Sequence, residues 1–355
     1  MKITALNVYM QRLALTKPYT IAYKTIEDTE VVFLEIILGN GIIGRGAANP
    51  FAEVVGETPA TTLSRLQGDF LKGLVGRDIS QFNQMIDESK LEFPHLPGTQ
   101  AAIDIALHDA FCQFLNISVL DFYGQKIKPI PTSITIGIKD TDSMIEEAKA
   151  NFAAGFRVMK IKTGLDVEQD IERVKKITEC FGGAVLVRAD ANQGYSLGDL
   201  KKFIAETAGL NIELVEQPLA VGEDWRLKAL AEDERKFLVA DESLLDADSA
   251  ISLTHKPLPY GVFNIKLMKC GGIKGAMEIA AIAKHAGISL FWGCNDESII
   301  SITAALHAAL SSSNTRYLDL DGSFDINETG VSGGFTLRDG VMYPNGLPGL
   351  GVQKK

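Results

Sequence analysis

The sequence has few cysteines, and none of them are paired by spacing. Its four cysteines are scattered along 355 residues without a C-x-x-C motif; they are Cys112, Cys180, Cys270 and Cys294. Such a pattern gives no sign of a disulfide framework. It predicts four reduced, mostly buried thiols in a cytoplasmic protein.

Long apolar runs are missing as well. No stretch approaches the roughly 20 apolar residues that a membrane-spanning helix needs. The first ten residues, MKITALNVYM, alternate like a strand and lack the apolar core and small-residue cleavage site of a signal peptide. We therefore expect neither secretion nor membrane insertion.

An excess of positive charge is also absent. Asp and Glu outnumber Lys and Arg by 45 to 35, which gives a formal net charge of −10. Without a basic stripe, general binding to the phosphates of nucleic acids is not expected. The acidic balance is compatible with a cationic or metal-bearing partner, although many soluble proteins are acidic.

The chain divides into three regions by pattern. Residues 1–55 indicate strands at Ile3–Gln11, Tyr19–Tyr23 and Val31–Leu38, followed by an Asn-Gly turn, and residues 57–125 are helical in pattern, with Thr58 as a helix N-cap. Strands followed by helices predict an α+β domain over residues 1–125. Strict alternation of strands and helices then predicts a barrel over residues 126–325, and residues 326–355 are expected to dock on the first domain.

Within the barrel region, single charged residues recur beside short apolar runs, at intervals of 25 to 28 residues and then 53. They are Lys162, Asp190, Glu216, Asp241, Lys266 and Asp319. The longer interval spans two steps, with Phe291-Trp292-Gly293 at its middle, and one step back from Lys162 lies Thr135. Eight apolar strands that end in this way predict a closed parallel barrel with its chemistry at the carboxyl ends of the strands.

Three neighbouring strand ends carry carboxylates: Asp190, Glu216 and Asp241. Any one of them could simply cap the next helix. Together, however, three converging carboxylates need a cation to stay ionised. Oxygen ligands without His or Cys favour a hard ion, and we predict one Mg²⁺.

Lysines flank this predicted metal site on both sides. Lys160 and Lys162 point to the same side of their strand, and Lys266 lies four strands away around the ring. They could be structural ion-pair partners of the carboxylates. Their order instead favours an amine on each face of a bound substrate, with a pKa lowered by burial and by a nearby cation. Proton abstraction next to a carboxylate, with Lys160 and the metal stabilising the enediolate, would then invert a stereocentre.

At these residues the chain resembles the enolase superfamily, in its muconate-lactonizing-enzyme-like subgroup. The motifs are Lys160-Ile161-Lys162, Asp190-Ala191-Asn192, Val215-Glu216-Gln217-Pro218, Ala240-Asp241-Glu242-Ser243 and Asn264-Ile265-Lys266-Leu267-Met268-Lys269. The resemblance covers essentially the whole chain. It implies a modified (β/α)₇β TIM barrel with an α+β capping domain built from both ends of the chain, Lys162 and Lys266 as acid/bases, and a Mg²⁺ cofactor.

The eighth strand end narrows this resemblance to the dipeptide epimerases. Asp319 and Asp321 share one face and resemble the pair that binds the free ammonium group of a dipeptide in that family, and Thr135 becomes a substrate contact. Lys24 stands where Ala-Glu epimerases carry an arginine, but Asp296 would repel a substrate glutamate and Glu53 could add to that field. Unless Lys24 pairs with Asp296 and cancels it, a cationic or uncharged second residue is expected.

Several functions stay open on the sequence alone. The leading hypothesis is inversion of the second residue of an L,L-dipeptide. The alternatives are an L-Ala-D/L-Glu epimerase, an o-succinylbenzoate synthase or cycloisomerase of the same superfamily, and a non-catalytic barrel that binds a metal or a peptide. The oligomeric state is also open, a homo-oligomer included.

Overall fold

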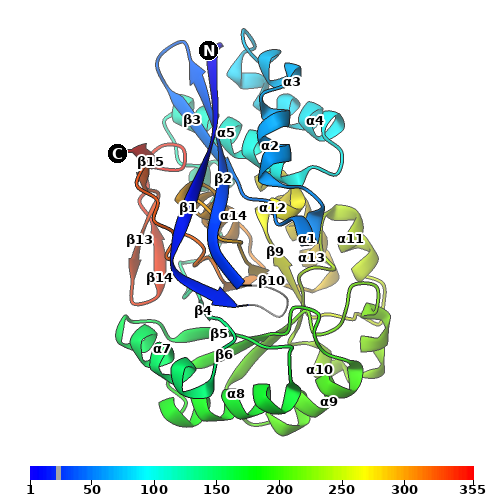
Figure 1. Ribbon diagram of the computed structural model, residues 1–355. Helices are drawn as coiled ribbons and strands as arrows, with labels where there is room; N and C mark the ends of the chain where they lie inside the picture. Colours follow the sequence, from blue (N-terminus) through cyan, green and yellow to red (C-terminus); the bar gives the residue numbers. More distant parts are fainter. Residues whose placement is uncertain (21–24) are drawn as a thin grey trace.

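The computed structural model describes residues 1–20 and 25–355 and consists of a cap above a barrel (Figure 1). The barrel contains eight parallel strands in sequential order, and a parallel bridge between Thr132 and Leu318 joins the first strand to the last. The strands are β4 (Ile134–Ile136), β5 (Val158–Lys162), β6 (Leu186–Asp190), β7 (Ile212–Glu216), β8 (Leu238–Ala240), β9 (Val262–Ile265), β10 (Ser289–Trp292) and β11 (Thr315–Leu318). The predicted barrel is confirmed.

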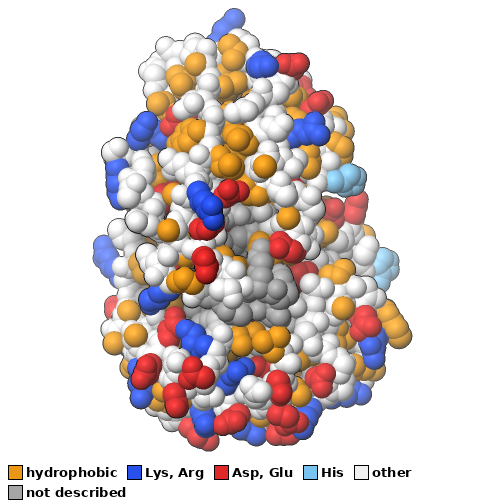
Figure 2. Space-filling model, in the orientation of Figure 1, with side chains coloured by type: hydrophobic (Ala, Val, Ile, Leu, Met, Phe, Trp, Pro, Cys, Tyr) orange, Lys and Arg blue, Asp and Glu red, His pale blue; other side chains and the backbone are white. Residues whose placement is uncertain are grey.

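Helices connect these strands on the outside of the barrel. They are α7 (Thr141–Ala153), α8 (Val167–Phe181), α9 (Leu197–Glu206), η2 (Asp224–Ala229), α10 (Glu232–Arg235), α11 (Ala247–Leu253), α12 (Leu267–Cys270), α13 (Ile273–Ala286) and α14 (Ile299–Leu310). Acidic and basic side chains are interspersed over α8 and α9 (Figure 2), where Lys202 pairs with Glu168.

One connection differs from its sequence prediction. A single helix was expected at Trp225–Ala231, but a 3₁₀-helix ends at Ala229 and a short α-helix begins at Glu232. Leu230 has an extended backbone, and the Glu234 side chain accepts a hydrogen bond from the Ala231 N–H at 2.7 Å. This second N-terminal cap starts a new helix and interrupts the expected one.

The cap begins with an antiparallel sheet of β1 (Ile3–Thr20), β2 (Thr25–Leu38) and β3 (Ile43–Ala48). Two separate strands were expected in place of β1. The strand is continuous because β1 pairs with β2 along both segments, with a register shift between Ala14 and Tyr19. The last expected residues of that second strand, up to Tyr23, lie outside the described residues.

Helices complete the described part of the cap: α1 (Ala52–Val55), α2 (Pro59–Leu66), α3 (Asp69–Lys72), η1 (Ile79–Gln81), α4 (Phe82–Glu92), α5 (Pro97–Leu115) and α6 (Val119–Tyr123). Thr58 caps α2 as predicted, since its side chain accepts a hydrogen bond from the Thr61 N–H. The β3 strand lies directly against α5, where a Cβ on Gly46 would come within 2.0 Å of the Ala102 carbonyl oxygen.

The end of the chain forms β12 (Val331–Gly333), β13 (Phe335–Arg338), β14 (Val341–Pro344) and β15 (Val352–Lys354). Its backbone bonds to the cap, because the Gly349 N–H donates to the Ile117 carbonyl at 2.8 Å and the Val119 N–H donates to the Gly349 carbonyl at 2.9 Å. Most buried apolar residues form one large cluster through cap and barrel, and a second, smaller cluster lies on β7 to β10 and consists of Leu214, Val239, Val262 and Phe291. The division at residues 125 and 325 stays a prediction.

Among the described residues, no helix is long and apolar enough to cross a membrane.

Candidate active site

The carboxyl ends of the barrel strands bring the predicted charges to one end of the barrel. Lys162 and Asp190 are register partners at the ends of β5 and β6, and Asp190 pairs in the same way with Glu216 on β7. Asp241 and Lys266 directly follow β8 and β9. The structure thus places the lysines and carboxylates in the order that the sequence indicated.

Lys160 lies at the centre of this cluster and is 3% exposed. Its Nζ lies 2.8 Å from Glu216, 2.8 Å from Asp319 and 3.0 Å from Asp190. Burial alone would lower the pKa of Lys160, but the attraction of these carboxylates outweighs it and raises the pKa well above its ordinary value. Lys160 is therefore a fixed positive charge inside the barrel.

The other two lysines lie on opposite sides of the cluster. Lys162 Nζ is 2.7 Å from Asp190 Oδ2 and donates to Asn192 Oδ1 at 3.0 Å, while Lys266 Nζ is 2.7 Å from Asp241 Oδ2. The sequence argument required a lowered pKa for a lysine base. Without a metal ion, the attraction of Asp241 outweighs burial and raises the pKa of Lys266. A divalent cation on Asp241 would oppose that attraction. A lowered pKa beside a bound cation stays a prediction.

The three carboxylates fit a hard cation by their chemistry and charge. Burial and the repulsion of Asp190 raise the pKa of Glu216 to about 8. Its buried Oε2 lies 2.8 Å from Lys160 Nζ but forms no hydrogen bond of good geometry within the described part of the chain. In Asp190 and Asp241 burial is outweighed by the lysines, which lower the pKa to about 2 in Asp190 and well below the ordinary value in Asp241. All donors are oxygens, as Mg²⁺ prefers.

Lysines hold these carboxylates in the structure. Among residues 1–20 and 25–355, no three His, Cys, Asp or Glu side chains are already gathered as metal ligands. Acidic side chains nevertheless outnumber basic ones here: Asp190, Glu216, Asp241, Glu242, Asp319 and Asp321 lie around Lys160, Lys162, Lys266 and Lys269. A divalent cation would balance this surplus.

Asp319 and Asp321 lie just beyond the end of the last strand, β11. Asp319 accepts hydrogen bonds from Ser133 Oγ at 2.6 Å and from Lys160 at 2.8 Å, and Asp321 accepts one from the Thr135 N–H at 2.7 Å. Burial and the repulsion of Asp319 raise the pKa of Asp321 to about 7, whereas Lys160 outweighs burial and lowers that of Asp319. Together they form an anionic pocket wall.

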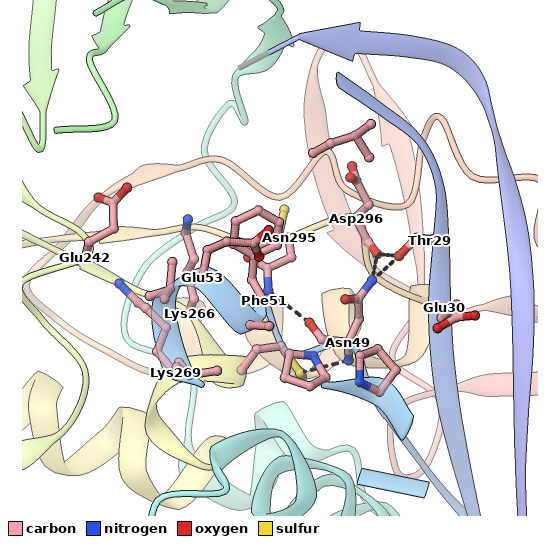
Figure 3. A pocket seen from close by; sticks show the side chains of 18 of the residues that line it. Thr29, Glu30, Asn49, Phe51, Glu53, Glu242, Lys266, Lys269, Asn295 and Asp296 are labelled. Carbon is pink, nitrogen blue, oxygen red and sulfur yellow. Dashed lines mark hydrogen bonds between the residues drawn. The ribbon is translucent and has the colours of Figure 1, made fainter. Parts of the chain in front are cut away.

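The cavity above these residues has two lobes that share Lys162, Lys266 and Asp296. The cap lobe, of about 470 Å³, lies against the cap and is lined by further acids, which are Asp28, Glu30, Glu53 and Glu242. Figure 3 shows the last three of them. The β4 lobe, of about 530 Å³, lies against β4 and α7 and is lined by Thr135, Glu146, Glu147, Asp319, Asp321 and Asp325. Lys24 lies outside the described residues, so its predicted contact stays untested.

Several residues in this site belong to the motifs quoted from the sequence but were given no role there. Lys269 donates to the Asp241 carboxylate and to the Asp241 carbonyl at 2.5 Å, and Asn264 Nδ2 donates to Glu216 at 2.7 Å. Asn192 follows Asp190 by two residues and holds Lys162. This two-residue spacing, which predicts that Asn192 and Asp190 share a face, is the signal in the sequence for the role of Asn192. The contacts of Asn264 and Lys269 depend on the register of neighbouring strands, which the spacing does not give.

Comparison with known proteins places this arrangement in a family. Residues 3–124 match the family model for the mandelate racemase / muconate lactonizing enzyme N-terminal domain, and residues 143–355 match the enolase C-terminal domain-like model. The chain belongs to the enolase superfamily.

Within this superfamily, its relatives include dipeptide epimerases. The L-Lys-D/L-Arg epimerase of Desulforapulum autotrophicum is 45% identical over the full length of both chains, and that of Methylococcus capsulatus is 44% identical over 99% of both. A solved structure of the dipeptide epimerase from Methylococcus capsulatus, complexed with Mg and the dipeptide L-Arg-D-Lys, superimposes with a TM-score of 0.97 over 99% of each chain. The chain is thus a member of the dipeptide epimerase family, whose enzymes are isomerases.

Proposed function

We propose that this chain is a Mg²⁺-dependent dipeptide epimerase that inverts the α-carbon of the second residue of a cationic dipeptide. The proposal rests on one observation. Lys162 and Lys266 stand at the carboxyl ends of two strands on different sides of the ring, and both line one acidic cavity. The similarity to L-Lys-D/L-Arg epimerases supports the substrate class.

Asp190, Glu216 and Asp241 would hold the Mg²⁺. When bound, this ion supplies positive charge to the carboxylate of the substrate and so acidifies the neighbouring α-proton. Lys160 contributes a second positive charge at the same place, because it is buried among the carboxylates and remains protonated. Its ammonium group would bind a carboxylate oxygen of the substrate and stabilise negative charge that develops there.

The two remaining lysines exchange protons with the substrate. One of Lys162 and Lys266 would remove the α-proton through Nζ, and the other would deliver a proton to the opposite face of the same carbon. Asn192 and Asp190 orient Lys162, and Asp241 orients Lys266. Because the two amines approach from different strands across the ring, removal and return on opposite faces invert the configuration.

The amino end of the dipeptide would bind at Asp319 and Asp321. Two carboxylates on one wall favour an ammonium group, and the Thr135 N–H holds Asp321 in place. Further acids in both lobes favour cationic side chains at both residues of the dipeptide. A substrate glutamate would meet Glu53 and Asp296 in the cap lobe, which disfavours an L-Ala-D/L-Glu epimerase.

We further propose that the protein works in the cytoplasm. All four cysteines are free, Cys112 and Cys270 buried as expected, but Cys180 exposed and Cys294 partly exposed. An exposed free thiol is typical of a reducing compartment. All residues of the proposed site come from one chain, so a homo-oligomer would carry one site per subunit.

A deuterium-exchange screen tests the proposed function. The protein is incubated with Mg²⁺ in D₂O and a panel of L,L-dipeptides with cationic, apolar and acidic second residues, and the mass of each dipeptide is measured. We expect incorporation of one deuterium at the second α-carbon, fastest for L-Arg-L-Lys and related cationic dipeptides. Absence of exchange with every dipeptide would contradict the proposal and favour another superfamily reaction or a binding protein.

A further inference from the structure

The backbone carbonyl of Asp296 is held from the cap by two buried side chains. Asn49 Nδ2, just beyond β3, donates to it at 2.7 Å, and Thr29 Oγ1 on β2 donates to it at 3.1 Å (Figure 3). Asn49 Nδ2 also contacts the Thr29 hydroxyl. Thr29 is 6% exposed and Asn49 is 8% exposed, so water does not compete for these bonds.

Asn49 contacts the barrel through its main chain as well. Its N–H donates to the sulfur of Met268, two residues beyond Lys266, at 3.3 Å, and its carbonyl accepts a hydrogen bond from Asn295 Nδ2 at 3.0 Å. One cap residue therefore bonds to α12, which follows β9, and to the loop after β10. This network of Thr29, Asn49, Asn295 and Asp296 is called the cap clamp below.

The barrel restrains the same loop from the other side. The Asn295 N–H donates to the buried Glu297 carboxylate at 2.9 Å. Gly322, in the loop after β11, packs so closely that a Cβ there would lie 1.9 Å from the Asn295 carbonyl oxygen. With its backbone fixed on both sides, Asp296 lines both lobes of the cavity.

We propose that Asn49, assisted by Thr29, is a positioning residue that determines selectivity for a cationic second residue by fixing Asp296. This inference rests on the proposed function. A carboxylate held in one place binds a cationic side chain without losing freedom of its own, whereas a mobile one must be ordered at each binding event. Because Asn49 forms no hydrogen bond with Lys162 or Lys266 in the described part of the chain, loss of the clamp should weaken binding and leave proton transfer intact.

A double-mutant cycle tests whether Asn49 acts through Asp296. Asn49→Leu keeps the approximate size of the side chain and removes its amide donor. We expect it to raise KM for L-Arg-L-Lys about tenfold and to leave kcat within about twofold. In an Asp296→Asn background, the same substitution should change KM less than about twofold, since the carboxylate that it positions is gone.

Thr29→Val is a second, smaller change to the same clamp. If Asn49→Leu lowers the yield of folded protein, Thr29→Val tests the role of the clamp in its place. It should raise KM about threefold in the wild-type background and leave it unchanged beside Asp296→Asn. Equal effects of either substitution in both backgrounds, or an effect confined to kcat, would overturn the clamp. A wild-type protein that is inactive on every dipeptide would overturn the proposed function itself, so the two failures are distinguishable.

Discussion

Asp319 has two possible roles, and substitution of this residue can separate them when two substrates are compared. Its carboxylate accepts hydrogen bonds from Lys160 and Ser133, and it faces the β4 lobe where the ammonium group of a dipeptide would bind. A second acid, Asp321, lies in the same wall. The ammonium role predicts dependence on the charge of the substrate's amino end, whereas a purely structural role does not.

We expect Asp319→Asn to lower kcat/KM for a free dipeptide by about 100-fold or more, because a buried ammonium group then loses a charged partner. For the N-acetylated dipeptide, which has no ammonium group, the same substitution should cost much less. Asp325→Asn, in the same lobe, serves as the matched control. An equal loss for both substrates would argue for a structural role, and no loss at all would favour a cycloisomerase-type reaction.

The acidic wall also predicts a dependence on pH. The pKa of Asp321 is raised to about 7, so its carboxylate takes up a proton as the pH falls through that value and no longer attracts an ammonium group. We expect kcat/KM for a dipeptide to decrease below pH 7 with an increase in KM. The Asp321→Asn variant should have a lower kcat/KM that lacks this step, as measured by the pH profile of initial rates. A step that persists in the variant would assign the titration to another group.

At the residue scale, the sequence identifies groups that stand at the end of their own strand. Lys162, Asp190 and Glu216 are of this kind, since strand periodicity alone brings them to one end of the barrel. Lys269 could not be identified in this way, because its contact with Asp241 depends on the packing of α12 against the end of β8. The position of Lys160 at the centre of the cluster could likewise not be predicted from the sequence, because it depends on how the ring of strands closes.

Among the elements, α14 contains an unusual buried histidine. His307 is 1% exposed, and neither ring nitrogen has a hydrogen-bond partner among the described residues. Burial lowers the pKa of His307 from its ordinary 6.5 to about 4. In the unfolded chain the ring takes up a proton below pH 6.5, while in the folded chain it stays neutral until about pH 4, so stability is lost as the pH falls through this window.

We therefore expect His307→Leu to reduce the loss of stability in acid. At about 1.4 kcal/mol per pKa unit, His307 lowers the free energy of unfolding by about 2 to 3 kcal/mol between pH 7 and pH 4.5. Urea unfolding at the two pH values should show this difference in the wild type and lose it in the variant. His255→Leu, at an exposed position, is the control and should leave the pH dependence as it is. An identical pH dependence in all three proteins would contradict the argument.

Element boundaries were less predictable than element types. The alternation of strands and helices predicted the barrel because each unit repeats one pattern. The long strand β1 was missed because its continuity depends on pairing with β2 and not on its own periodicity. The two short helices after β7 were merged into one because the Glu234 cap depends on the extended conformation of Leu230.

For the whole molecule, the surplus of buried negative charge predicts that a divalent cation stabilises the fold. Mg²⁺ at a concentration 100-fold above its dissociation constant should raise the free energy of unfolding by about 2.7 kcal/mol. EDTA should abolish both this gain and the exchange activity. In Glu216→Gln, the melting temperature should respond much less to Mg²⁺, while Glu146→Gln in the β4 lobe should respond as the wild type does. Equal Mg²⁺ responses in all three would place the ion elsewhere.

The relation between cap and barrel is the part of the whole molecule that sequence patterns did not predict. Glu53 and Asp296 were recognised as acids near the substrate, but the bonds that fix Asp296 come from Thr29 and Asn49, far away in the sequence. Such contacts depend on how the two units pack. The predicted domain limits say where each unit begins and ends but do not predict how the units pack.

The most direct test of the central claim, two lysines on opposite faces of one substrate carbon, is stereospecific exchange in single lysine variants. Lys162→Ala and Lys266→Ala are each incubated in D₂O and Mg²⁺ with L-Arg-L-Lys and, separately, with L-Arg-D-Lys, and deuterium at the second α-carbon is followed by NMR. Each variant should lose epimerisation and exchange the α-proton of one diastereomer only, a different one for each variant. Full epimerase activity in either variant would contradict the mechanism.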